Sequence, residues 1–228
     1  LEAALAEKVT SFLYTSTIPV FVMPHGAVFD ETRLDPQPKA TPYERSKQEA
    51  DRLVAAALER GLPARFLHPS GVYGPAPVMT GVNEFLRRLA RGEIPMLLPG
   101  GMPVVFAADV ARGHLLAEQK APVGARFILS ESYLTLQEMA RAVMEHVPTA
   151  RIPAILPRWV ARAVSTTGEL WARFSGMTPL IPSGQLHFLT IEARPSAQRA
   201  RREPGWSPTS FTDGLRVTLA DLKARGEI

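Results

Sequence analysis

Cysteine is absent from this chain of 228 residues. Its absence excludes disulfide bonds, catalysis by a thiolate and zinc sites built from cysteine, and we expect no bound metal. No apolar run approaches the about 20 residues of a membrane-spanning helix, and the first residues lack the basic-then-apolar pattern of a signal peptide. The sequence therefore predicts a cytoplasmic protein without a membrane partner. Its apolar content of 46% is sufficient for one large domain or two small ones.

Charge is unevenly distributed along the chain. Residues 1–150 contain 15 basic and 16 acidic side chains, whereas residues 151–228 contain 11 basic and 6 acidic ones. A basic C-terminal third could meet a phosphate-bearing ligand or, as a weaker alternative, nucleic acid. The arginines are scattered without aromatic residues between them, which is typical of a solvated helical face. We therefore predict no nucleic-acid partner.

The sequence TPYERSK, which ends at Lys47, has the features of a helix start. Thr41 can cap the helix, Pro42 suits its first position, and Glu44 completes a capping box. Tyr43 and Lys47 are four residues apart and share one helical face. An ammonium group beside a phenol favours the phenolate, so Tyr43 is a candidate acid/base for a carbinol or carbonyl substrate. The alternative is a surface tyrosine beside a solvated lysine.

Two short β-branched and aromatic runs flank this helix, at residues 9–14 and 64–67. The order strand, helix, strand predicts parallel βαβ units. The first run ends in three hydroxyl side chains, Thr15, Ser16 and Thr17. Because ligands gather at the carboxyl ends of parallel strands, a hydroxyl here could hold a substrate oxygen. The alternative is a Ser/Thr turn whose hydroxyls bond their own backbone.

The rest of the chain alternates between loops and periodic segments. We predict a polar loop at 22–40, a helix at 81–91, a strand at 103–106, a helix at 110–118 capped by Asp109, a strand at 126–129, a helix that starts at Thr135 with Glu138 at the box position, a helical stretch at 152–174 and a last helix at 209–224.

Four motifs in a fixed order carry a resemblance to a known family. They are FLYTST at 12–17, TPYERSK at 41–47, PSGVYGP at 69–75 and FAADVA at 106–111. In this order and spacing the chain resembles the extended short-chain dehydrogenase/reductase (SDR) family, the NAD(P)-dependent epimerase/dehydratase group. Segments 174–179 and 196–206 are similar to its dihydroflavonol-reductase-like and hopanoid-associated sugar epimerase branch.

This resemblance implies an α/β fold: the C-terminal part of a Rossmann-type doubly wound parallel sheet, with a smaller, mixed and mostly helical substrate lobe. Residues 1–75 and 105–122 would form the partial NAD(P)-binding domain, and residues 76–104 and 123–228 the substrate lobe. It also implies NAD or NADP as cofactor, a small-molecule substrate and a possible homodimer.

The resemblance assigns roles to residues at matching positions. Tyr43 would be the catalytic acid/base, Lys47 would hold the nicotinamide ribose, and Thr17 would hydrogen-bond the substrate oxygen, with Ser16 as the alternative hydroxyl. The residues expected to bind the cofactor are Thr15, Tyr43, Lys47, Pro69, Ser70 and Val72. Those expected to bind the substrate are Ser16, Thr17, His68 and Asn83. His68 stands where the family usually has arginine, and a packed histidine is the alternative there.

The family usually opens with a strand and a Gly-x-x-Gly-x-x-Gly turn that binds the pyrophosphate, and this chain has no such motif. We therefore expect a chain truncated at its N-terminus, by about 100 residues if a whole βαβαβ half is missing. The resulting prediction is an NAD(P)-dependent oxidoreductase or epimerase that acts on a sugar nucleotide or hydroxy-ketone by hydride transfer. The alternative is a catalytically silent SDR-like binding or interaction module.

Overall fold

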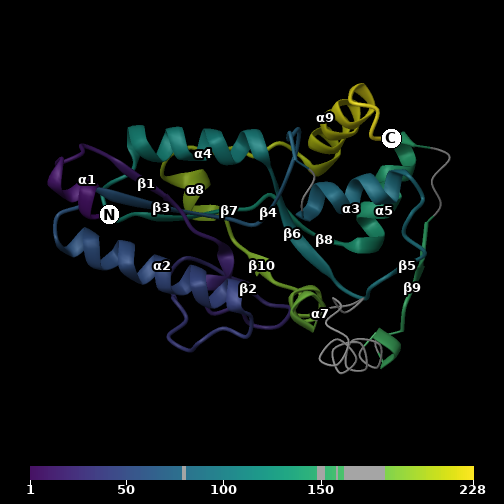
Figure 1. The fold of residues 1–228 in the computed structure, drawn as a ribbon, viewed down its shortest axis with the longest axis horizontal. Coiled ribbons are helices and arrows are strands. Elements are labelled where there is room, and N and C mark those ends of the chain that lie inside the picture. The colour runs from purple at the N-terminus through teal and green to yellow at the C-terminus, as the bar shows by residue number, and fades with distance from the viewer. Residues whose placement is uncertain (79–80, 148–151, 158, 162–182) are drawn as a thin grey trace.

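The computed structural model describes residues 1–78, 81–147, 152–157, 159–161 and 183–228. Figure 1 shows two sheets beside one another, each covered by its own helices. Within the described residues, no helix has both the length and the apolar character needed to cross a bilayer.

The first sheet has the strand order β1-β3-β7, and all its strands are parallel. These strands are β1 (Phe12–Thr15), β3 (Ala64–Pro69) and β7 (Arg126–Leu129). Helix α2 (Pro42–Glu59) covers one face, and α4 (Ala107–Lys120) and α8 (Gln198–Arg202) cover the other (Figure 1). A parallel sheet between two helical layers is the predicted doubly wound arrangement, and its carboxyl ends meet at one edge.

Local sequence explains where two helices begin. The Thr41 side chain accepts a hydrogen bond from the backbone of Glu44, whose carboxylate accepts one from the backbone of Thr41 at 3.0 Å. Thr135 and Glu138 form the same reciprocal pair at the start of α5 (Leu136–His146). Both predicted capping boxes are therefore confirmed, and each satisfies backbone donors that a helix start leaves unpaired.

The predicted cap at Asp109 is wrong. Helix α4 begins at Ala107, two residues before Asp109, so Asp109 lies in its first turn. Its buried carboxylate instead accepts a hydrogen bond from the backbone N–H of Thr209 at 2.6 Å and pairs with Arg112. The indole of Trp206 donates to the Asp109 carbonyl, so this residue ties the C-terminal segment to the first sheet.

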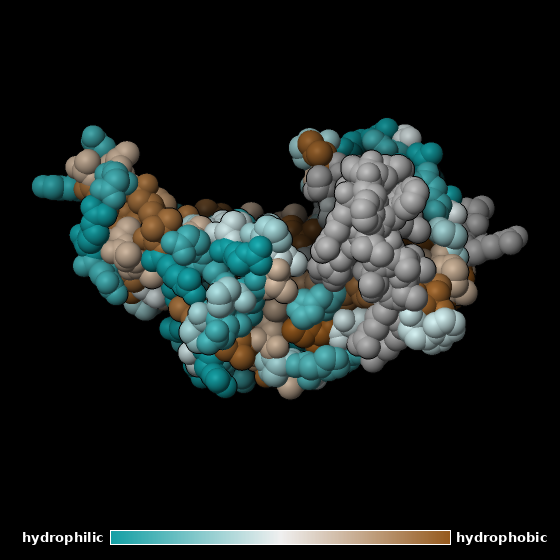
Figure 2. All heavy atoms as spheres, turned by 60° about the horizontal axis from the view of Figure 1, so that its bottom comes forward, coloured by the Kyte–Doolittle hydropathy of each residue, from teal (hydrophilic) through white to brown (hydrophobic). Residues whose placement is uncertain are grey.

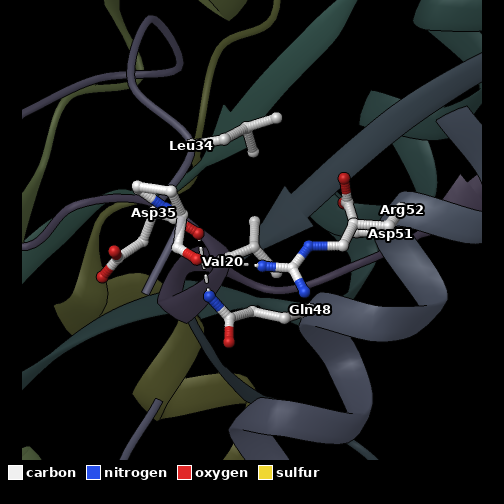
Figure 3. A pocket seen from close by; sticks show the side chains of 7 residues that line it. Val20, Leu34, Asp35, Gln48, Asp51 and Arg52 are labelled. Atoms are coloured by element: carbon white, nitrogen blue, oxygen red, sulfur yellow. Dashed lines mark hydrogen bonds between the residues drawn. The ribbon is translucent and has the colours of Figure 1, made fainter. Parts of the chain in front are cut away.

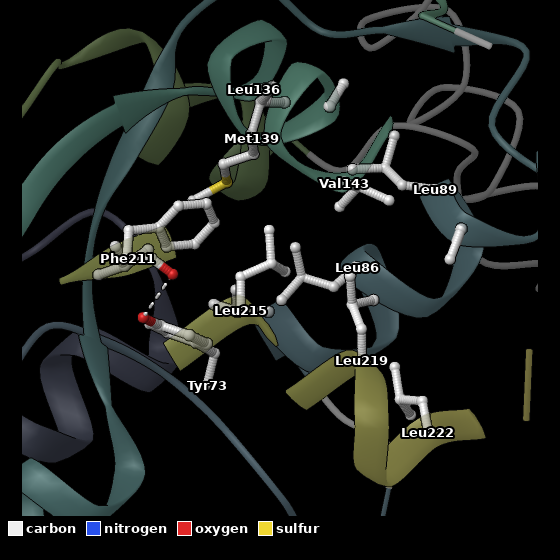
Figure 4. Packing of buried hydrophobic residues seen from close by; sticks show 14 of the residues in the cluster. Tyr73, Leu86, Leu89, Leu136, Met139, Val143, Phe211, Leu215, Leu219 and Leu222 are labelled. Carbon is white, nitrogen blue, oxygen red and sulfur yellow. Dashed lines mark hydrogen bonds between the residues drawn. The ribbon is translucent and has the colours of Figure 1, made fainter. Parts of the chain in front are cut away.

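The second sheet has the order β4-β6-β8, with β4 parallel and β8 antiparallel to β6. These strands are β4 (Gly71–Tyr73), β6 (Gly101–Phe106) and β8 (Ser132–Thr135). Helices α3 (Gly81–Ala90), α5 and α9 (Phe211–Ala224) enclose the largest apolar core (Figure 4). At Gly101 a side chain has no room, because a Cβ would lie 2.2 Å from the carbonyl oxygen of Leu134.

Short elements complete the described chain. They are α1 (Glu2–Ala6), the 3₁₀ helix η1 (Ile18–Val20), α7 (Ser183–Thr190), the strand pair β2 (Val28–Phe29) and β10 (Arg194–Pro195), and the pair β5 (Met96–Leu97) and β9 (Ala154–Ile155). The predicted loop 22–40 therefore contains a strand. The predicted helical stretch 152–174 begins with strand β9, and most of it lies outside the described residues, as does the segment 174–179.

The C-terminal part of the chain returns to the first sheet. Strand β7 pairs with β3, and α8 packs against β7, although the predicted division places 123–228 in the substrate lobe. Trp206 lies in the same apolar cluster as Leu67 and Phe127. The division stays a prediction elsewhere, but β7 and α8 belong structurally with the parallel sheet.

Candidate active site

The predicted catalytic residues lie where α2 passes the carboxyl end of β1. Thr17 is the N-cap of η1, and η1 packs against α2. Figure 1 shows α2 lying along the sheet with one end near β2, in the middle of the molecule. The space-filling view in Figure 2 shows an outline that is hollowed between the two ends of the molecule, with hydrophobic residues along part of the hollow.

Tyr43 and Lys47 lie on one face of α2, as their spacing predicts. The Lys47 Nζ is 6.0 Å from the centre of the Tyr43 ring. The Tyr43 residue is 58% exposed, so its hydroxyl is open to a ligand. Among the described residues Lys47 forms no ion pair with a carboxylate, and its ammonium group is available to a bound molecule.

Tyr14 connects the end of β1 electrostatically to α2. Burial raises the pKa of Tyr14, and the charges of Asp51 and Tyr43 act in the same direction. Both of these residues belong to α2. The Tyr14 ring packs against the apolar cluster that contains Val54 and Ala57 of α2, so the end of β1 lies against this helix.

The first of the three hydroxyls at the end of β1 faces the other side of the sheet. Thr15 Oγ1 is 2.7 Å from Nε2 of His114 in α4, and Nδ1 of His114 is 2.8 Å from the carbonyl oxygen of Val110. Because a carbonyl only accepts, we assign the imidazole proton to Nδ1, so Nε2 accepts from Thr15. His114 lies 99 residues from Thr15, and no local pattern in the sequence indicates this contact.

The second hydroxyl is buried in a polar group that the sequence analysis did not find. Ser16 donates to Asp51 Oδ2 at 2.8 Å, and Arg126 donates to Asp51 Oδ1 at 2.7 Å. His68 Nε2 lies 3.2 Å from Asp51 Oδ2. We call Ser16, Asp51, His68 and Arg126 the Asp51 cluster. It joins α2 to β3, to β7 and to the residue that follows β1.

The Asp51 cluster changes the interpretation of two predicted substrate-binding residues. His68 is fully buried, and its ring packs 4.6 Å from that of Phe21, which favours the packed-histidine alternative. Ser16 is 4% exposed and its proton is donated to Asp51. The Ser16 hydroxyl is used within the protein, and His68 is fully buried, with no partner for its Nδ1 among the described residues. The structure therefore gives no support to their predicted contact with substrate.

The negative charge of Asp51 is balanced by the positive charge of Arg126. Burial opposes the ionisation of Asp51, but the hydrogen bond from His68 and the charge of Arg126 outweigh burial and lower the pKa of Asp51. Burial lowers the pKa of His68, which favours the neutral imidazole, while Asp51 acts in the opposite direction. The Asp51 carboxylate and the Arg126 guanidinium therefore pair directly, with the neutral His68 ring beside them.

The turn after β3 contains the remaining predicted residues. Pro69 ends β3, Ser70 is buried with no hydrogen-bond partner for its Oγ among the described residues, and Val72 is 40% exposed. Asn83 holds this turn closed: its amide accepts from the backbone N–H of Gly74 at 2.9 Å and donates to the Gly74 carbonyl at 2.8 Å. The Asn83 amide is thus occupied within the protein, and its predicted role with substrate lacks support.

The groups at this edge fit a dinucleotide. An unpaired buried hydroxyl at Ser70, a hydroxyl at Thr17 and the Lys47 ammonium are the kinds of group that hydrogen-bond ribose and nicotinamide, and they lie at or beside the carboxyl ends of parallel strands. By contrast, the described residues contain no group of three acidic or histidine side chains that could hold a metal ion.

Comparison with known proteins agrees with this geometry. Residues 1–129 match the model of the NAD dependent epimerase/dehydratase family. The chain is 27% identical to sterol demethylase protein B of Methylococcus capsulatus, over 100% of this chain and 71% of that protein. It is also 27% identical to a putative dihydroflavonol 4-reductase of Synechocystis, over 89% of this chain and 61% of that protein.

A solved structure shares the fold. A nucleoside-diphosphate-sugar epimerase from Pseudomonas aeruginosa superimposes with a TM-score of 0.82 over 100% of this chain and 71% of that one, at 22% identity. At this identity the likeness concerns the fold alone. The family model, in contrast, matches more than half of the sequence, and the chain therefore belongs to the NAD dependent epimerase/dehydratase family.

Proposed function

We propose that this protein is an NAD(P)-dependent oxidoreductase or epimerase that acts on a sugar nucleotide or a hydroxy-ketone, with Tyr43, Lys47 and Thr17 as its catalytic residues. The observation that carries the proposal is the placement of Tyr43 and Lys47 on one face of α2, beside the hydroxyl-bearing end of β1. NAD is the cofactor that the family implies.

Each residue has a role that its chemistry suits. Bound at the edge of the sheet, the nicotinamide supplies a hydride acceptor or donor. The exposed Tyr43 hydroxyl moves the proton of the substrate hydroxyl, and Thr17 hydrogen-bonds the same substrate oxygen. Lys47 binds the ribose hydroxyls, and the turn from Pro69 to Val72 borders the nicotinamide. These groups position the reactants, which can supply a large share of the rate enhancement. The predicted cofactor contact of Thr15 lacks support, because its hydroxyl bonds His114 on the other face of the sheet.

The proposed substrate class follows from what the relatives' names have in common. One is named for a sterol, one for dihydroflavonol, and the structural neighbour for a nucleoside-diphosphate sugar. These molecules differ in size and polarity, but each contains a hydroxyl-bearing carbon, and we propose an exchange between alcohol and ketone at such a carbon. A single acid/base with a hydride carrier serves that exchange in either direction, and so it serves both reduction and epimerisation.

A catalytically silent binding module is the second candidate. It is favoured by one observation: the 228 residues contain no Gly-x-x-Gly-x-x-Gly turn for the pyrophosphate. This candidate predicts that the Tyr43 site takes part in no turnover with either cofactor.

Turnover of the full-length protein with NADH and NADPH on a panel of nucleotide sugars and hydroxy-ketones tests the proposal. We expect Tyr43→Phe to lower turnover by about 10²- to 10⁴-fold while leaving the unfolding temperature unchanged, because only the proton-transfer group is lost. The matched control is Ser46→Ala, one turn further along the same helix, whose hydroxyl bonds the Tyr43 carbonyl. Turnover of Tyr43→Phe equal to that of the control would contradict the proposal.

A further inference from the structure

Asp51 lies on the same face of α2 as the two proposed catalytic residues, but at the buried end of that face. Tyr43, Lys47 and Asp51 follow each other at intervals of four residues. The exposed fraction falls from 58% at Tyr43 to 3% at Asp51. The helix therefore presents its reactive side chain to a ligand and anchors itself two turns later.

The anchor is made of directed hydrogen bonds to the first sheet. Asp51 accepts from Ser16 and from Arg126 through different carboxylate oxygens, and its contact with His68 adds a third partner. Arg126 is itself held in place, with its guanidinium carbon 3.9 Å from the centre of the Phe66 ring. The hydrogen bond from Ser16 to an ionised carboxylate is charge-assisted and stronger than one between neutral groups.

Polar contacts surround this part of α2. Asp51 borders a cavity of about 160 Å³ between the helix and the loop after β2 (Figure 3). Gln48 and Arg52 of α2, which also line the cavity, donate to backbone carbonyls of that loop. Beside this cavity the polar contacts of Asp51 add to the apolar packing of Val54 and Ala57 in fixing where the helix lies against the strand.

Ser16 is the link between this anchor and the site. It directly precedes Thr17, so the bond from its side chain to Asp51 fixes the peptide that carries the proposed substrate-binding hydroxyl. The same bond fixes the helix that carries Tyr43. A change of about 1 Å in the separation of two catalytic groups can lower a rate by about 100-fold.

We propose that Ser16 and Asp51 are positioning residues, and that their hydrogen bond sets the distance between the Thr17 hydroxyl and the Tyr43 phenol. This inference rests on the proposed function. It differs from the earlier expectation for Ser16, because the residue acts through Asp51 and does not touch the substrate.

A double-mutant cycle in the full-length protein tests the inference. Ser16→Ala is expected to lower kcat by about 10- to 100-fold with the KM of substrate and cofactor unchanged. Asp51→Asn is expected to lower kcat at least as much, and the double variant no further than Asp51→Asn, because both remove one contact. The control is Thr218→Val, which removes a buried hydroxyl that donates to the Gly214 carbonyl in α9; it should leave kcat unchanged.

The outcomes separate this inference from the proposed function. A raised substrate KM in Ser16→Ala, or losses that multiply in the double variant, would show that Ser16 touches the substrate and would overturn the inference. If Tyr43→Phe is inactive, a wild-type kcat in Ser16→Ala would also overturn the inference. Wild-type turnover in Tyr43→Phe would instead overturn the proposed function. If Asp51→Asn does not fold, the separate changes of kcat and KM in Ser16→Ala decide the inference.

Discussion

Two buried carboxylates in the first half of the chain have opposite surroundings. Asp51 and Glu31 are 3% and 7% exposed, so both have lost most of their contact with water. Around Asp51, a hydrogen bond from His68 and the charge of Arg126 overcome the effect of burial and lower its pKa. Around Glu31, burial dominates and raises its pKa. The groups that contact each carboxylate, and not the extent of its burial, decide which one is stably charged.

The difference reflects what each carboxylate does in the fold. Asp51 connects α2 to β3, to β7 and to the residue after β1, through side chains that carry charge or donate hydrogen bonds. Glu31 accepts a hydrogen bond from the backbone of Ile128 in β7 at 2.7 Å. That bond satisfies a donor on a strand that, within the described residues, pairs only with β3. The negative charge strengthens the contacts of Asp51, whereas the bond that Glu31 accepts does not need one.

Removing the Asp51 carboxylate should have the largest effect. We expect Asp51→Ala to lower the free energy of unfolding by about 3–5 kcal/mol, because Arg126 keeps a largely buried charge without its partner. Urea denaturation measures this change. The control is Asp221→Ala, which removes a partly exposed ion pair with Arg225 at 3.2 Å and should change stability by less than about 1 kcal/mol. Equal losses of unfolding free energy in Asp51→Ala and Asp221→Ala would contradict the prediction that the buried carboxylate contributes more to stability than the partly exposed one.

Acid should weaken the Asp51 cluster through His68. Burial lowers the pKa of His68 in the folded protein, so below about pH 6.5 the unfolded chain takes up a proton that the folded one does not. Stability is therefore lost as the pH falls through this range, by up to about 1.4 kcal/mol per pH unit. We expect His68→Gln to flatten the decline between pH 7 and 5, whereas His25→Gln, at an exposed site, should leave it as in the wild type. The same slope in all three proteins would contradict the assignment.

Sequence-local features of the fold and site could be predicted. Thr41 and Thr135 cap helices through residues three positions away, and Tyr43 and Lys47 share a face because a helix repeats every 3.6 residues. The hydroxyls at the end of β1 follow from the strand pattern before them. In each case the physical cause lies within one or two turns of the chain.

Contacts across the sequence could not be predicted. Asp51 meets Arg126 over 75 residues, and Asp109 meets Thr209 over 100, so the cap expected at Asp109 gave way to a partner that only the fold supplies. The burial of Ser16 and His68 has the same origin. The four-residue spacing from Lys47 to Asp51 could have indicated a buried acid on the active face, but nothing local indicates its partners.

Neutralising Glu31 should have the smallest effect and the opposite sign. We expect Glu31→Gln to raise the free energy of unfolding at pH 7 by about 1 kcal/mol, since the amide oxygen still accepts from Ile128 and no buried charge remains. Because the pKa of Glu31 is raised in the fold, its ionisation destabilises the protein as the pH rises above the unfolded value near 4.5. The advantage of the variant should therefore shrink as the solution is acidified towards that pH. Glu118→Gln, on the exposed surface of α4, serves as the control with no such dependence. If Glu31→Gln is less stable than the wild type at pH 7, the bond to β7 requires the charge of Glu31. Asp51 and Glu31 would then both depend on their charge and would differ only in how much.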